Sequence, residues 1–222
     1  MTTILPAVIP KSRRHLDAML MLFGSFTNEC QVDIVDGIFD DSKSWPYNTS
    51  LALADVLLLQ RFDQMRVELD LMIKNPEDTL DTWLRTGASR IIIHVESTNH
   101  LDDILAHAGT HAYQLGLAFT NDTDLSLLST VDMSCVDFVQ LMGIADIGEQ
   151  GNPFDARVIP RIAFVRKAFP KLPISIDGGV TKETITTLKH AGATKFVVGS
   201  AIVRALQPAL AYKELEALAK MG

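Results

Sequence analysis

The sequence predicts a single (β/α)₈ barrel that extends over residues 1–222. Short apolar runs alternate with longer helical patterns eight times, an alternation that implies a parallel sheet with right-handed crossovers. The length suits one such domain. Aromatic residues make up only 7% of the chain, a balance that favours buried parallel strands over an antiparallel sandwich. An open doubly wound sheet is the alternative, but no GxGxxG follows the first apolar run.

The elements follow from this alternation in chain order. Each predicted strand is a short apolar run, and each predicted helix is a longer segment with helical periodicity between two such runs. The predicted strands are Ile4–Ile9, Gln31–Asp36, Arg66–Ile73, Ile91–Val95, Gln114–Phe119, Phe138–Leu141, Ile174–Asp177 and Lys195–Val198. The predicted helices are Ser12–Phe23, Ser50–Gln60, Pro76–Thr86, His100–Ala108, Asp124–Ser129, Asp155–Ala168, Lys182–Ala191 and Pro208–Lys220.

Composition narrows the classes of partner. The net charge of −7 argues against a nucleic-acid binder, because no basic stripe is available to neutralise phosphates. No apolar stretch approaches the roughly 20 residues needed to span a bilayer, and the N-terminal segment lacks a signal-peptide core. Cys30 and Cys135 fit no CxxC pattern and are expected to be reduced thiols. We therefore expect a cytoplasmic protein with a small-molecule substrate; assembly into a homo-oligomer stays open.

Carboxylates at strand ends are the first candidates for chemistry. In a (β/α)₈ barrel, functional side chains gather at the C-terminal ends of the strands. Asp33, Asp70 and Asp177 occupy such ends. Asp36 follows Asp33 by three residues and therefore points to the other face of the strand. We expect Asp36 to serve the turn at Gly37 rather than the pocket.

Glycine turns supply the second signal. Gly178 and Gly179 follow the seventh predicted strand, and Gly199 and Ser200 follow the eighth. Phosphate groups commonly bind between these two loops of such barrels, at backbone amides that glycine leaves accessible. The two turns together predict a phosphate site.

Five segments resemble the ribulose-phosphate 3-epimerase family along nearly the whole chain: VDIVDGIF, LDLMIKNPE, IIIHVES, SIDGGVTKET and FVVGSAI. The resemblance implies inversion of C3 of a ketopentose 5-phosphate, ribulose 5-phosphate to xylulose 5-phosphate. It implies that Asp33 and Asp177 exchange protons with opposite faces of the substrate through an enediolate. The residues predicted to bind substrate or phosphate are Gly148, Gly178, Gly179, Gly199, Ser200, Met72 and His94.

The resemblance breaks at the metal site. The family binds one divalent metal through two histidines and the two aspartates, and here Gln31 and Asp70 stand at the histidine positions. Gln31 with Asp33, Asp70 and Asp177 would form an all-oxygen ligand set, which suits Mg²⁺ or Mn²⁺ better than Zn²⁺. The alternative is a metal-free site in which a protonated Asp70 donates a hydrogen bond.

Two other functions compete with the epimerase. One is a different enediolate reaction in a related barrel, such as isomerisation, decarboxylation or aldol cleavage. The decarboxylase branch is disfavoured because the third strand reads LDLMI rather than a DxK pattern. The other is a non-catalytic sugar-phosphate binder. The presence of both Asp33 and Asp177 argues against it, because phosphate binding alone needs neither residue.

Overall fold

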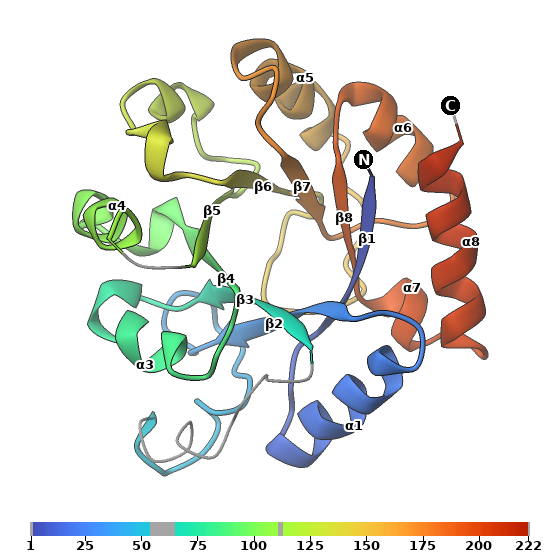
Figure 1. Cartoon of the computed structure of the whole chain (residues 1–222), viewed down its shortest axis with the longest axis horizontal. Coiled ribbons are helices and arrows are strands. Elements are labelled where there is room, and N and C mark those ends of the chain that lie inside the picture. The colour runs from blue at the N-terminus through green and yellow to red at the C-terminus, as the bar shows by residue number, and fades with distance from the viewer. Residues whose placement is uncertain (1, 54–64, 111–112, 222) are drawn as a thin grey trace.

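The chain folds into a closed barrel of eight parallel strands. A computed structural model describes residues 2–53, 65–110 and 113–221. Each strand pairs with the next along the chain, and β8 pairs with β1 to close the ring. Figure 1 shows the strands at the centre and the helices arranged around them. The predicted parallel (β/α)₈ barrel is confirmed.

The strands lie where the apolar runs predict them. No strand end differs from its predicted position by more than two residues, and β5, β7 and β8 agree at both ends. The observed strands are β1 (Thr3–Val8), β2 (Glu29–Val35), β3 (Arg66–Met72), β4 (Arg90–His94), β5 (Gln114–Phe119), β6 (Phe138–Met142), β7 (Ile174–Asp177) and β8 (Lys195–Val198).

The helices agree less closely with their predictions. The observed helices are α1 (Arg13–Gly24), α3 (Leu80–Leu84), α4 (Leu101–Ala108), α5 (Val158–Ala168), α6 (Ile185–Ala191), α7 (Ser200–Val203) and α8 (Pro208–Lys220). The predicted helix Ser50–Gln60 falls mostly on residues 54–64, which lie outside the described residues. The predicted helix Asp124–Ser129 is instead a short 3₁₀ turn, Leu125–Ser129.

The helix predicted over Pro76–Thr86 is wrong as a single element. Asn75 adopts a left-handed conformation with φ of 49°, and a 3₁₀ turn over Pro76–Asp78 follows it. The backbone N–H of Asp78 bonds to the carbonyl of Asn75, and that of Thr79 to the carbonyl of Pro76. These three-residue spacings tighten the backbone, so that the α-helix begins only at Leu80.

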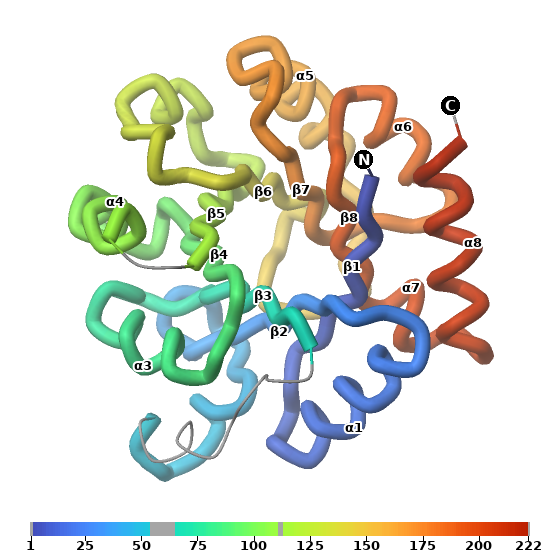
Figure 2. Tube along the Cα trace, in the orientation of Figure 1, coloured from blue at the N-terminus to red at the C-terminus, as the bar shows by residue number. Residues whose placement is uncertain are grey.

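Two different environments surround the strands. Side chains that point outward, such as Val32 and Ile176, pack with helix residues such as Leu16, Phe23 and Trp83 in one large apolar core. Successive residues of a strand point to opposite faces, so every second side chain enters the barrel. Figure 2 shows how β1, in blue, lies beside β8, in orange-red, where the ring closes. The barrel interior is therefore built from the alternate residues of all eight strands.

Among the described residues, no helix is both long enough and apolar enough to cross a membrane.

Candidate active site

Three carboxylates meet inside the barrel near the C-terminal ends of its strands. Asp33 lies on β2, Asp70 on β3 and Asp177 at the end of β7, and Asp33 and Asp70 are direct neighbours in the register of β2 and β3. Each offers an oxygen within 4.8 Å of the others. Asp70 is fully buried, Asp33 is 5% exposed, and Asp177 is partly exposed.

The amide of Gln31 links two of these carboxylates. Its Nε2 donates to Asp33 Oδ1 at 2.8 Å and to Asp177 Oδ2 at 2.5 Å. Its Oε1 is buried without a hydrogen-bond partner among the described residues. Gln31 lies two residues before Asp33 on β2, so strand alternation directs both side chains into the barrel. The amide therefore bridges acids from β2 and β7.

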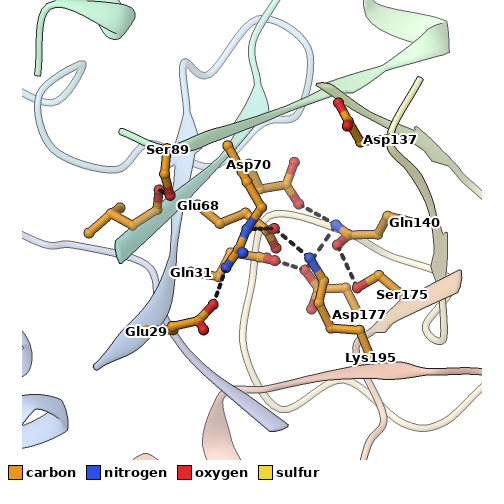
Figure 3. Close-up of polar contacts among 12 residues, drawn as sticks. Glu29, Gln31, Glu68, Asp70, Ser89, Asp137, Gln140, Ser175, Asp177 and Lys195 are labelled. Carbon is orange, nitrogen blue, oxygen red and sulfur yellow. Dashed lines mark hydrogen bonds and ion pairs between the residues drawn. The ribbon is translucent and has the colours of Figure 1, made fainter. Parts of the chain in front are cut away.

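A second amide, Gln140 on β6, completes the cluster. Its Nε2 donates to Asp70 Oδ2 at 2.8 Å and to Asp177 Oδ2 at 3.3 Å, while Ser175 Oγ donates to its Oε1 at 3.3 Å. Figure 3 shows Gln31, Asp70, Gln140 and Asp177 pointing toward one another. Sequence reasoning missed Gln140. The one available signal was a polar residue inside the otherwise apolar run Phe138–Met142, at the alternation that faces the barrel interior.

His94 is fully buried and lies behind Asp70. Its Nε2 is 3.1 Å from Asp70 Oδ1, and its Nδ1 is 3.9 Å from a carboxylate oxygen of Glu96. The side chain of His94 is 0% exposed and is not among the residues that line the cavity, so its predicted contact with the substrate stays a prediction. Burial lowers the pKa of His94, but the adjacent Asp70 carboxylate more than offsets this, so the pKa is raised.

The two carboxylates that reach the cavity have perturbed pKa values. Burial, followed by the charges of Asp177 and Asp70, raises the pKa of Asp33 well above its usual range. Burial and the charge of Asp70 raise the pKa of Asp177 to about 7, although the amide of Gln31 opposes the shift. Carboxyl groups that hold a proton near neutral pH are suited to general acid and base chemistry.

A cavity of about 300 Å³ opens above the carboxylates. Gly178 and Gly179 turn the chain after β7 with φ angles of 88° and 66°, values that side chains disfavour. A Cβ at Gly199 would lie 2.5 Å from Gln150 Nε2, so a larger residue there would have to displace the end of the Gln150 side chain. The wall includes Asp33, Met72, Met142, Gly148, Gln150, Asp177, Gly178, Gly179, Gly199 and Ser200.

The structure therefore divides the predicted site residues into two groups. Asp33, Asp177, Met72, Ser200 and the four predicted glycines line the cavity. Gln31, Asp70 and His94 are fully buried and support it from within the barrel. Asp36 has the turn role expected of it. Its Oδ1 accepts from the backbone N–H groups of Ile38 and Phe39, and its Oδ2 from that of Lys74.

The donor set of the cluster fits a hard divalent cation. Three carboxylate oxygens within 4.8 Å of one another match the preference of Mg²⁺ and Mn²⁺ for oxygen ligands. Rotation of the Gln31 amide would turn its unpartnered Oε1 toward the same space as a fourth oxygen, and O and N of an amide are assigned from their partners. His94 Nε2 lies 3.1 Å from Asp70 Oδ1, but among the described residues no histidine or cysteine belongs to the group whose ligand atoms lie within 4.8 Å of one another, and zinc sites usually include such ligands.

A closed parallel barrel with carboxylates near its strand ends, beside two glycine turns, is an arrangement typical of enzymes of the (β/α)₈ class. Residues 3–203 match the model of the Ribulose-phosphate 3 epimerase family. The chain belongs to this family, whose members are isomerases of the epimerase type.

Individual relatives agree with the family match. The ribulose-phosphate 3-epimerase of Chlamydia pneumoniae is 30% identical over 180 residues, which cover 78% of this chain and 75% of the relative. The cytoplasmic isoform of ribulose-phosphate 3-epimerase from Oryza sativa subsp. japonica is 26% identical over 180 residues, covering 80% of this chain and 76% of the relative.

Solved structures share the fold at lower identity. The 3-hexulose-6-phosphate synthase of Salmonella typhimurium superposes with a TM-score of 0.71 at 14% identity, covering 99% of this chain and 98% of that one. The phosphoribosyl anthranilate isomerase of Thermococcus kodakaraensis gives a TM-score of 0.66 at 15% identity, covering 100% of both chains. At such identities the likeness extends to the barrel fold alone.

Proposed function

We propose that the protein is a ketose-phosphate 3-epimerase that interconverts ribulose 5-phosphate and xylulose 5-phosphate. The observation that carries the proposal is the convergence of Asp33 and Asp177 on one cavity, each with a raised pKa. Two acids from well-separated strands supply the two proton-transfer groups that inversion of one carbon requires. Membership of the epimerase family supports the same reaction.

The reaction is a pair of proton transfers at C3. One aspartate, as the carboxylate, removes the C3 proton, and the electron pair of the broken C–H bond moves into an enediolate with the adjacent ketone. The other aspartate, as the carboxylic acid, donates its proton to the opposite face of C3. The product has inverted configuration at C3. The two aspartates have exchanged protonation states, and proton exchange through the site then restores the original states.

The raised pKa values suit this division of roles. Two carboxylates that share a confined site cannot both ionise easily, so the pair tends to hold one proton between them. One acid and one base are then present together near neutral pH, as the reaction requires. When no cation occupies the site, the amide hydrogen bonds from Gln31 join the two groups and maintain their spacing.

The glycine turns support the proposal that the phosphate group of the substrate binds at one wall of the cavity. Gly178 and Gly179 after β7, with Gly199 and Ser200 after β8, form one wall of the cavity. Exposed backbone N–H groups at such turns bind phosphate oxygens. Met72 and Met142 lie on the same cavity wall and would pack against the carbon chain of the sugar.

We further propose that Asp33, Asp70, Asp177 and a rotated Gln31 hold one hard divalent cation, Mg²⁺ or Mn²⁺ rather than Zn²⁺. When bound, such a cation polarises the ketone and stabilises the negative charge of the enediolate. Metal analysis of protein purified without chelator, followed by Mn²⁺ titration of the chelated protein, tests this. A bound or activating cation is expected; if neither is found, the site operates without metal.

Product analysis tests the proposed substrate. Purified protein is incubated with ribulose 5-phosphate, and ¹³C NMR follows the appearance of xylulose 5-phosphate. Turnover to xylulose 5-phosphate is expected, with slower turnover of hexulose 6-phosphates. A different product would indicate another enediolate reaction, and phosphate-dependent binding without turnover of any ketose phosphate would indicate a binding protein.

A further inference from the structure

A polar side chain that the proposed mechanism leaves without a role lies directly behind Asp177. Gln140 is 0% exposed and lies outside the wall of the cavity. It therefore cannot touch a ligand in the cavity. It does contact Asp177, which lines the cavity and carries one of the two proposed proton transfers.

The orientation of the Gln140 amide is determined by its partners at both ends. Its Nε2 faces two carboxylate oxygens, Asp70 Oδ2 at 2.8 Å and Asp177 Oδ2 at 3.3 Å. Carboxylate oxygens accept hydrogen bonds, so the NH₂ group, which is the donor end of the amide, faces them. At the other end, the hydroxyl of Ser175 donates to Oε1 at 3.3 Å. Every polar atom of the amide is therefore satisfied, which fixes the side chain in one conformation.

Both amides of the cluster bond to the same oxygen of Asp177. Gln31 and Gln140 each donate to Oδ2, and within the described residues no hydrogen bond ends on Oδ1. Two donors on one oxygen fix the plane of the carboxyl group, which leaves Oδ1 available to a ligand in the cavity.

The two amides differ in which of the proposed catalytic acids they contact. Gln31 donates to both Asp33 and Asp177. Gln140 donates to Asp177 and to the buried Asp70, and no hydrogen bond joins it to Asp33 among the described residues. Gln31 therefore supports both proton transfers, whereas Gln140 supports only the transfer that Asp177 performs.

We propose that Gln140 is a positioning residue for Asp177, anchored by Ser175, and that it orients the carboxylate that serves one face of C3. The inference rests on the proposed function, because it requires Asp177 and Asp33 to serve opposite faces. Its specific consequence is asymmetric. Removing the Gln140 amide should slow the proton transfer at Asp177 and leave the transfer at Asp33 largely unchanged.

Isotope effects at C3 separate the two transfers. For the epimer whose C3 proton goes to Asp177, a slower transfer becomes more fully rate-limiting, so the primary deuterium isotope effect on kcat/KM should rise. For the other epimer, the proton goes to Asp33 in a step that no longer limits the rate, so its isotope effect should fall. A loss of folded enzyme lowers both rates but changes neither isotope effect.

The test compares Gln140→Met with the unchanged protein, using 3-deuterated ribulose 5-phosphate and 3-deuterated xylulose 5-phosphate as substrates. The unchanged protein must first epimerise these sugars; if it does not, the proposed function fails on its own account. For Gln140→Met we expect kcat to fall by about 100-fold, the loss typical of a misplaced catalytic group. KM should change by less than about twofold, because the amide does not reach the cavity. The two isotope effects should move in opposite directions.

Three further variants complete the test. Gln31→Met should lower kcat without an opposed shift of the isotope effects, because Gln31 contacts both acids. Gln114→Leu removes an exposed amide on the neighbouring β5 and should change nothing. Ser175→Ala frees the Gln140 amide to rotate and should move the isotope effects as Gln140→Met does, but less, so it also serves if Gln140→Met does not fold. Unchanged isotope effects in both Gln140→Met and Ser175→Ala, or effects that move together, would overturn the inference.

Discussion

The barrel interior contains two layers of buried acids that are compensated in different ways. In the layer near the C-terminal ends of the strands, Asp33 and Asp177 are joined by the neutral amide of Gln31. In the layer near the N-terminal ends, Glu68 is joined to two cations, Arg90 and Lys195. Figure 3 shows Glu68 and Lys195 near the cluster of Asp70, Gln140 and Asp177.

The layer near the N-terminal ends of the strands, the lower layer, is an ion-pair network, whereas the layer near the C-terminal ends is the upper layer. Arg90 Nε lies 2.8 Å from Glu68 Oε2, and the ammonium of Lys195 contacts the same oxygen. Arg90 also pairs with Glu29 at 2.6 Å, and Lys195 lies 3.9 Å above the ring of Phe138. In (β/α)₈ barrels, residues at the N-terminal face of the strands usually contribute to stability, and residues at the C-terminal face to catalysis. The network is suited to closing the bottom of the barrel.

The two layers differ in the charge of the groups that face their buried acids. In the lower layer, two cations, Arg90 and Lys195, face the buried carboxylate of Glu68. In the upper layer, amides satisfy the hydrogen bonds of the carboxylates but bring no positive charge, so burial and mutual repulsion raise the pKa values of Asp33 and Asp177. The same fold thus places an ion-paired acid at one end and acids with raised pKa values at the other.

Replacing either upper acid should have the largest effect. Asp33→Asn or Asp177→Asn keeps the size of the side chain and the hydrogen bond from Gln31 but removes the proton-transfer group, so kcat should fall by about 10³-fold or more. Steady-state kinetics with ribulose 5-phosphate measures the loss. Both variants should largely retain binding of an unreactive pentitol 5-phosphate, as measured by calorimetry. Substantial activity in either variant would contradict the roles of these acids.

Breaking the lower network should affect stability instead. Lys195→Met removes one of the two cations at the fully buried Glu68, so the free energy of unfolding should fall by about 3 kcal/mol. Urea denaturation measures the change. In the double variant Glu68→Gln with Lys195→Met, the destabilisation should be smaller, because no carboxylate is left uncompensated. If Lys195→Met leaves stability unchanged but lowers kcat, the lower layer is not the structural one.

The third effect is smaller and has the opposite sign. The pKa of Asp177 is about 7 in the folded protein against an ordinary value of 3.8. Between these pH values the folded state holds a proton that the unfolded state has lost, so the free energy of unfolding falls as pH rises through this window. Asp177→Asn lacks this loss and should be more stable than the unchanged protein at pH 8, when both are measured in chelator. The advantage should disappear near pH 4.

Thermal or urea unfolding at pH 4 and pH 8 checks this sign. Asp33→Asn serves as the companion variant, because the pKa of Asp33 is raised for the same reasons. An Asp177→Asn variant that is less stable than the unchanged protein at pH 8 would show that favourable interactions offset the burial of the ionised Asp177 carboxylate.

The sequence predicts the barrel and the surface of the site well. Apolar runs identify the eight strands because their side chains are buried on both faces of a parallel sheet. Asp33 and Asp177 are recognisable because they lie in the last residues of strands, and the glycine turns because they directly follow strands. These features depend on local sequence and on one global rule, namely that the C-terminal ends of parallel strands meet at one face.

The buried layers beneath the site are less predictable. Gln140 reaches Asp70 across 70 residues of chain and Asp177 across 37, so its contacts exist only once the barrel closes. Glu68 and Lys195 are separated by 127 residues and look like ordinary charged residues near strand starts. His94 was expected at the cavity because it ends β4, but its partner Asp70 holds it in the interior. Partners of this kind depend on barrel register rather than on sequence pattern.

Proton exchange at C3 tests the central claim most directly. The protein is incubated with ribulose 5-phosphate in D₂O, and NMR follows deuterium at C3 together with the formation of xylulose 5-phosphate. We expect solvent deuterium at C3 of the inverted product, and no exchange in Asp33→Asn or Asp177→Asn. Exchange without inversion would point to another enediolate reaction, and the absence of exchange in the unchanged protein, with or without Mn²⁺, would contradict the assignment of Asp33 and Asp177 as the acid and base.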